Sequence, residues 1–104
     1  MFSDLVDQPV IVMRVEPEEL KRVLAKLLPP YKVILFNDDY NSMEYVIAVL
    51  LRLIQQMTQP AAMEIMLTAH LTGSAVVAVC PKERAEFYQE GLSGYGLTAT
   101  IEPE

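Results

Sequence analysis

A short apolar segment that runs into three polar residues limits most strongly how this chain can fold. Residues 32–36, KVILF, have the composition of a β-strand, and because nearly all of them are apolar we expect both faces of the strand to be covered. Asn37, Asp38 and Asp39 follow at once, and residues of these types end strands and form turns. The sequence therefore predicts a polar cluster at the end of a buried strand.

A helix is predicted to begin near Ser42. Asn41 followed by Glu44 matches a capping box, in which Asn41 caps the first turn and Glu44 bonds back to the cap. The apolar residues beyond this point recur at helical spacing, which predicts one buried face: Met43, Val46, Ile47, Leu50, Leu53, Ile54 and Met57.

A second helix is predicted to follow closely. Thr58 can cap it, and Pro60 is tolerated in its first turn because the missing N–H is not needed there. The helix is expected to run to about Leu71. Gly73 is then well placed to end it in a left-handed conformation.

The remaining segments complete one domain. Residues 74–80 are expected to form a buried strand, residues 82–90 a helix, and residues 97–101 a strand with one exposed face. The order βααβαβ predicts an α+β, two-layer domain over residues 31–104, in which a three-stranded antiparallel sheet packs against three helices.

Residues 1–30 differ from this domain, because prolines and acidic residues interrupt them. We expect a flexible N-terminal extension with one short helix over residues 18–28, where apolar residues recur at helical spacing. Pro29 and Pro30 would end that helix.

Composition excludes several classes of function. The chain has 104 residues and a formal net charge of −6, without a basic cluster, so neither nucleic acid nor an anionic membrane is an expected partner. The single cysteine, Cys80, leaves no internal disulfide or zinc motif, and no signal peptide or membrane span is recognisable. We expect a monomeric cytoplasmic protein that needs no metal or cofactor.

The only histidine, His70, lies at helical spacing from Met66 and Met63. A lone histidine at the end of an apolar helix is more often a packing residue, and Asn-Asp clusters often serve only as turns. Two adjacent carboxylates, Asp38 and Asp39, nevertheless repel each other unless a cation is near. A cation-binding site beside methionines is the functional alternative. No nucleophile motif accompanies the histidine, so an enzyme is not expected.

Two segments of this sequence resemble the ClpS family, the adaptors that deliver substrates with particular N-terminal residues to Clp-type ATP-dependent proteases. They are YKVILFNDDYNSMEYVI, which resembles the family's strand-to-helix signature, and IMLTAHLTGSAVV, which resembles its second helix and strand. The resemblance covers roughly residues 31–102.

The resemblance implies the ligand and the residues that bind it. The ligand would be a free α-amino terminus with Leu, Phe, Tyr or Trp as its first residue. Asn37, Asp39 and His70 match the groups that hold the ammonium, and Asp38 matches one that contacts the ligand backbone. The residues that match the lining of the side-chain pocket are Met43, at the gate, and Val46, Met66, Ala69 and Leu97. The implied partners are a Clp-type AAA+ ATPase and N-degron proteins.

Two departures from the family pattern concern the pocket rim and the partner contact. Asn41-Ser42 replaces the usual Thr-Pro, and Tyr88 occupies a position where a basic residue often contacts the ATPase. The alternative to an adaptor is a structural interaction domain of ribosomal-stalk-like shape, in which the polar cluster is only a turn.

Overall fold

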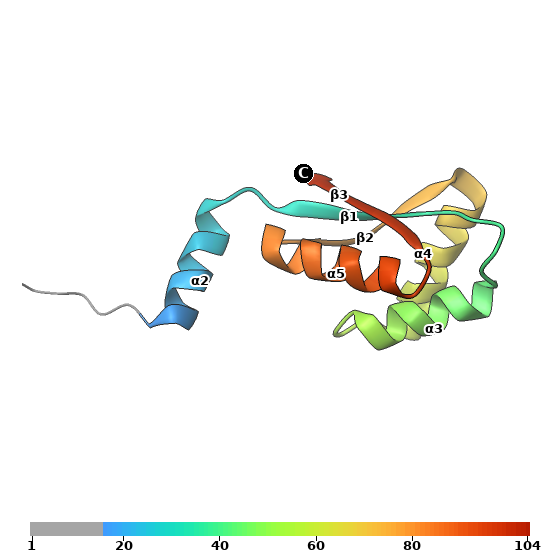
Figure 1. Cartoon of the computed structure of the whole chain (residues 1–104), viewed down its shortest axis with the longest axis horizontal. Helices are drawn as coiled ribbons and strands as arrows, with labels where there is room; N and C mark the ends of the chain where they lie inside the picture. The colour runs from blue at the N-terminus through green and yellow to red at the C-terminus, as the bar shows by residue number, and fades with distance from the viewer. Residues whose placement is uncertain (1–15) are drawn as a thin grey trace, which may run out of the picture.

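The structure is a computed structural model that describes residues 16–104. The helices are α2 (Pro17–Leu27), α3 (Met43–Leu53), α4 (Gln59–Thr72) and α5 (Lys82–Gly94); the strands are β1 (Tyr31–Phe36), β2 (Ser74–Cys80) and β3 (Thr98–Pro103) (Figure 1). From β1 onward the order is βααβαβ, which confirms the predicted α+β class. The predicted flexibility of the N-terminal extension concerns mainly residues 1–15, which lie outside the described residues.

The three strands form one antiparallel sheet with β1 in the centre, in the order β2-β1-β3. At one end Tyr31 pairs with Cys80, and at the other Phe36 pairs with both Ser74 and Thr98. The register of β1 against β2 shifts between Val33 and Ile34, which marks a bulge. Phe36 therefore ends β1 where β2 and β3 both begin.

The predictions that residues 32–36 are covered on both faces and that residues 74–80 form a buried strand each hold for one face only. Val33 and Leu35 of β1 are buried, but on β2 Val76 is 47% exposed and Val79 is 51% exposed. The cause is that α3, α4 and α5 pack on one side of the sheet and leave the other face open (Figure 1). The core lies between this helical layer and the sheet, and its largest fully buried side chains are Leu50, Leu92 and Val33.

The apolar stripe of α3 faces that core as predicted from its helical spacing. The helix ends at Leu53, so two predicted members of the stripe, the buried Ile54 and the partly buried Met57, follow it. Within the helix Leu50 is buried, and Val46, Ile47 and Leu53 pack against the core with partial exposure. Met43 is the exception. Its side chain is 40% exposed because it stands at the first residue of the helix, beyond the edge of the sheet.

The start of α3 differs from the predicted capping box. Ser42, rather than Asn41, is the cap, and its hydroxyl accepts the Tyr45 N–H at 3.1 Å. The Asn41 N–H and its side-chain NH2 both donate to Asp38 in the preceding turn, which orients this side chain toward Asp38 instead of the first turn of α3. The helix consequently begins one residue later than a cap at Asn41 would place it.

The ends of α4 agree with the sequence signals. The Thr58 hydroxyl accepts the Ala61 N–H at 3.3 Å, and Pro60 lies in the first turn. Gly73 ends the helix with φ 100°, in the left-handed region. Its N–H donates to the Ala69 carbonyl at 2.8 Å, so the chain reverses at once into β2.

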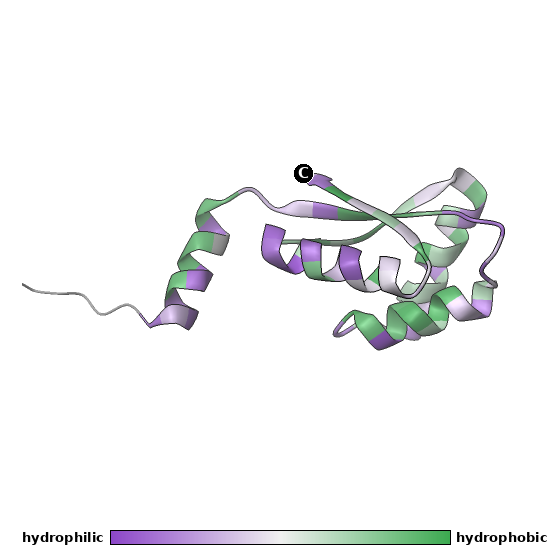
Figure 2. Ribbon diagram, in the orientation of Figure 1, coloured by the Kyte–Doolittle hydropathy of each residue, from purple (hydrophilic) through white to green (hydrophobic). Residues whose placement is uncertain are grey.

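Helix α2 stands away from the sheet and its helical layer (Figure 1). One side of it is apolar and exposed, with Leu20, Val23, Leu24 and Leu27 each more than two-fifths exposed. The green stripe along α2 in Figure 2 marks this side. Burial of these apolar residues therefore contributes little to the stability of α2.

Replacing Gly73 tests the importance of the left-handed turn between α4 and β2. Gly73→Ala forces a β-carbon into a conformation that costs about 1–2 kcal/mol for an L-residue, so the free energy of unfolding should fall by that amount. Gly94→Ala is the matched control, because Gly94 ends α5 without a positive φ and has open space around it. Urea unfolding followed by circular dichroism measures both. Equal unfolding midpoints for the two variants would contradict this account of the turn.

Candidate functional site

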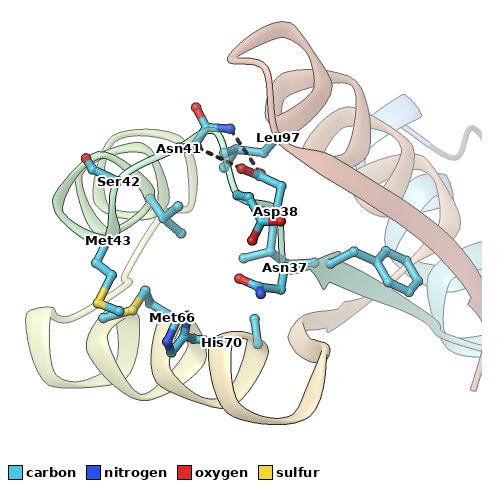
Figure 3. Close-up of a pocket in the computed structure, with 13 residues that line it drawn as sticks. Asn37, Asp38, Asn41, Ser42, Met43, Met66, His70 and Leu97 are labelled. Carbon is cyan, nitrogen blue, oxygen red and sulfur yellow. Dashed lines mark hydrogen bonds between the residues drawn. The ribbon is translucent and has the colours of Figure 1, made fainter.

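A cavity of about 270 Å³ opens where β1 ends, between the start of α3, the last turns of α4 and the residue before β3 (Figure 3). Every site residue predicted from the sequence lines it: Asn37, Asp38, Asp39, Met43, Val46, Met66, Ala69, His70 and Leu97. The structure thus brings three separate parts of the chain to one place. Leu35, Phe36, Asn41 and Ser42 also line the cavity and were not predicted as site residues.

The pairing of β1 with β2 places Asn37 beside His70. Because β2 begins directly after Gly73, the end of β1 that pairs with Ser74 lies against the end of α4. The Asn37 N–H extends this pairing by donating to the Gly73 carbonyl at 3.0 Å. His70 lies one turn back along α4, and Figure 3 shows its ring on the same side of the cavity as the Asn37 amide.

Within residues 16–104, three polar side chains of the cavity have no hydrogen-bond partner in the protein. They belong to Asn37, Asp39 and His70, which are exposed. An amide oxygen, a carboxylate and an imidazole nitrogen can each accept a hydrogen bond. This side of the cavity therefore offers acceptors to a donor that enters it.

Asp38 differs from these three, because its carboxylate organises the loop. Oδ1 accepts the N–H groups of Tyr40 at 2.9 Å and Asn41 at 2.8 Å, and Oδ2 accepts the Asn41 side-chain amide at 3.0 Å. Burial opposes ionisation of this carboxyl, but the bonds from Asn41 and Tyr40 together outweigh it and hold the pKa of Asp38 below its ordinary value. The turn interpretation of the polar cluster is thus correct for Asp38.

The rest of the cavity lining includes apolar side chains. Met66, Ala69 and Leu97 are buried against the core, and Met43 lies at the mouth, across from Asp38 in Figure 3. Met63, which the helical spacing grouped with His70, lines a different surface. It belongs to an apolar groove on the outer side of α4 that also contains Pro60, Leu67 and Leu71.

Asn41 is the residue of this region that sequence reasoning interpreted wrongly. Beyond its bond to Asp38, its side-chain amide donates to the Gly96 carbonyl at 3.1 Å. The three-residue spacing from Asp38 was a visible signal for the first bond. The second joins residues 55 positions apart, and nothing local in the sequence indicates it.

Tyr88 of α5 and Cys80 of β2 were also discussed from the sequence. Tyr88 is only 6% exposed and packs in the core, so this chain presents no side chain at that position to a partner. Cys80 is the last residue of β2 and is partly buried. Burial raises the pKa of its thiol, and Arg84 lies near enough to oppose that rise in part. A raised pKa keeps the thiol protonated and unreactive at neutral pH.

Within residues 16–104, no helix combines the length and apolar character that crossing a membrane requires. The same residues contain no group of three or more His, Cys, Asp or Glu side chains placed to hold a metal ion.

Comparison with known proteins identifies the family. The model of the family described as "ATP-dependent Clp protease adaptor protein ClpS" matches residues 26–100. The chain is 48% identical over 79 residues to the ATP-dependent Clp protease adapter protein ClpS of Synechococcus elongatus, covering 76% of this chain and 83% of the relative. It is 50% identical over 92 residues to the corresponding protein of Gloeobacter violaceus, covering 88% and 99%.

A solved structure agrees in fold. The structure of Agrobacterium tumefaciens ClpS2 bound to L-phenylalaninamide superimposes with a TM-score of 0.65 at 40% identity, covering 73% of this chain and 98% of that one. The matched sequence includes the strand-to-helix segment and the histidine-bearing helix that together form the cavity. The chain therefore belongs to the ClpS family of adaptors of the ATP-dependent Clp protease.

Proposed function

We propose that this adaptor binds the free α-amino group and the large hydrophobic first residue (Leu, Phe, Tyr or Trp) of N-degron proteins, and delivers them to a Clp-type AAA+ ATPase. The observation that carries the proposal is the position of Asn37, Asp39 and His70. Their side chains, which have no hydrogen-bond partner within residues 16–104, border the same cavity as an apolar wall. L-phenylalaninamide, the ligand of the Agrobacterium protein, combines an amino group with a phenyl side chain, and supports this assignment.

The polar side of the cavity has the chemistry that an ammonium group requires. An ammonium donates three hydrogen bonds, and the Asp39 carboxylate, the Asn37 amide oxygen and a neutral His70 nitrogen provide three acceptors. Asp39 also supplies a negative charge. Asp38, whose Oδ2 keeps one lone pair beyond the loop bonds, is proposed to contact the ligand backbone.

The volume of the cavity suits one amino-acid side chain with its amino group. At about 270 Å³ it lies just below the roughly 300 Å³ at which pockets for drug-sized ligands begin. One large side chain with its amino group is therefore a better match than an extended cofactor. Met66, Ala69 and Leu97 supply apolar contact for that side chain.

The expected affinity is moderate. Each charge-assisted hydrogen bond contributes on the order of 1.5–3 kcal/mol, and burial of one large apolar side chain contributes roughly 1.5–3 kcal/mol. Loss of translational and rotational freedom on association opposes these terms by several kcal/mol. Micromolar dissociation constants are expected, which allow an adaptor to release its cargo.

The alternative of a purely structural domain requires the polar cluster to act only as a turn. Asp38 accepts the turn bonds of this loop, whereas within residues 16–104 the side chains of Asn37, Asp39 and His70 form no hydrogen bond with the protein. The adaptor proposal gives these three side chains a role and the structural alternative does not. We further propose that the adaptor acts as a monomer in the cytosol, with no nucleic acid or membrane partner.

Blocking the amino group of the ligand is the direct test of this function. A fluorescent peptide that begins with Phe should bind with a micromolar dissociation constant. Its N-acetylated twin should bind at least about 100-fold more weakly, because it lacks the charge and the donors that the site is built to satisfy. Fluorescence anisotropy measures both. Equal binding of the two peptides would rule out recognition of the amino group.

Removing single acceptors tests their assignment. Asp39→Ala and His70→Ala should each weaken binding of the Phe peptide roughly tenfold or more, and leave the circular dichroism spectrum unchanged because neither side chain bonds to the fold. Glu44→Ala is the matched control, since it removes an exposed carboxylate of α3 that does not line the cavity. Wild-type affinity in either test variant would contradict the role assigned to that residue.

Met43 is proposed to restrict the first residue at the mouth of the cavity. Met43→Ala widens the mouth, so peptides that begin with Val or Ile should gain affinity relative to a Leu peptide. Met63→Ala is the control, because Met63 is 43% exposed, close to the 40% of Met43, but lies on the outer side of α4. A peptide array measures the preference. No gain for Val or Ile would mean that Met43 does not select the first residue.

A further inference from the structure

Asn41, in the loop before α3, and Tyr45, in the first turn of α3, bond to the two residues that precede Leu97. The Asn41 amide donates to the Gly96 carbonyl at 3.1 Å, and the Tyr45 hydroxyl donates to the Tyr95 carbonyl at 2.7 Å. These carbonyls belong to the residues immediately before Leu97. We call Asn41 and Tyr45, with these two bonds, the rim clasp.

The clasp supplies bonds that the backbone of this segment does not make on its own. The N–H groups of Tyr95, Gly96 and Leu97 all donate to carbonyls of the last turn of α5. Gly96, with φ 85°, then turns the chain toward β3. The backbone bonds therefore fix the segment to α5, and the two clasp bonds connect it to Asn41, in the loop before α3, and to Tyr45, in the first turn of α3.

Asn41 bonds both to the loop of Asp38 and to the residue before Leu97. One amide group donates to the Asp38 carboxylate at 3.0 Å on the polar side and to the Gly96 carbonyl on the side of Leu97. An amide nitrogen has two hydrogens, so both bonds can be made at once. Figure 3 shows the Asn41 side chain above the cavity, between the loop of Asp38 and Leu97.

Leu97 is the cavity residue that directly follows the two residues bound by the clasp. It is 4% exposed, lies directly after Gly96 and lines the cavity. Apolar pockets discriminate between side chains by close contact, and a wall that moves outward loses contact with a short side chain before it loses contact with a long one. The depth of the pocket therefore depends on how firmly this segment is held.

We propose that Asn41 and Tyr45 are positioning residues that set the preference among first residues by holding Leu97 against the cavity. This inference rests on the proposed function, because it concerns the same ligand and the same site. Neither residue is assigned a contact with the ammonium. Their effect is on the wall that the first side chain meets.

The test measures selectivity rather than affinity alone. Tyr45→Phe removes one hydroxyl and keeps the ring, and Asn41→Ala removes the amide. Both variants, and the double variant, are titrated by fluorescence anisotropy with peptides that differ only in a first residue of Leu or Trp. The ratio of the Leu to the Trp dissociation constant should rise about threefold in Tyr45→Phe and about fivefold in Asn41→Ala, and further in the double variant.

Gln89→Ala separates positioning of Leu97 from general loosening of the fold. The Gln89 amide donates to the Ala99 carbonyl at 3.2 Å, so it holds β3 to α5 with the same kind of bond but does not line the cavity. It should lower the melting temperature about as much as Asn41→Ala and leave the selectivity ratio at the wild-type value. An equal change of the ratio in Gln89→Ala would overturn the inference.

Failure of this inference is distinguishable from failure of the proposed function. If folded Tyr45→Phe and Asn41→Ala keep the wild-type ratio while the wild-type protein still rejects the N-acetylated Phe peptide, the clasp does not set selectivity and the proposed function stands. If the wild-type protein binds free and acetylated peptides equally, both are overturned.

Discussion

The hydrogen bond from the Asn37 N–H to the Gly73 carbonyl, at 3.0 Å, marks the constraint on which the rest of the site depends. Helix α4 ends at Thr72, one residue reverses the chain, and β2 begins at Ser74. Once β1 pairs antiparallel with β2, its end must lie beside the end of α4. The polar residues after β1 and the histidine of α4 are thus neighbours because of strand pairing, although more than thirty positions of sequence separate them.

The same arrangement explains why one cavity combines polar acceptors with an apolar wall. The sheet and its helical layer end here, so buried side chains of α4 and the residue before β3 border exposed polar ones. An ammonium needs acceptors and partial hydration, and a large apolar side chain needs exclusion from water. A site at the edge of the core meets both needs without burying a charge in the interior, which would be costly.

Local signals in the sequence predicted much of this structure. The strand before Asn37, the cap at Thr58 and the left-handed Gly73 each depend on a few adjacent residues, and the structure contains all three. The exposed face of β2, the buried Tyr88 and the bond between Asn41 and Gly96 depend on which elements pack together. Sequence spacing carries no direct information on such distant contacts. Asn41 illustrates this, because its bonds to Asp38 and Gly96 displaced the predicted cap by one residue.

A crystal structure of this protein with L-phenylalaninamide is the most direct test of whether the cavity binds an amino group together with a large apolar side chain. We expect the amino group to lie within hydrogen-bonding distance of Asn37, Asp39 and His70. We expect the phenyl ring to contact Met66 and Leu97. A ligand bound instead in the apolar groove on the outer side of α4, or an amino group that points into solvent, would contradict this expectation.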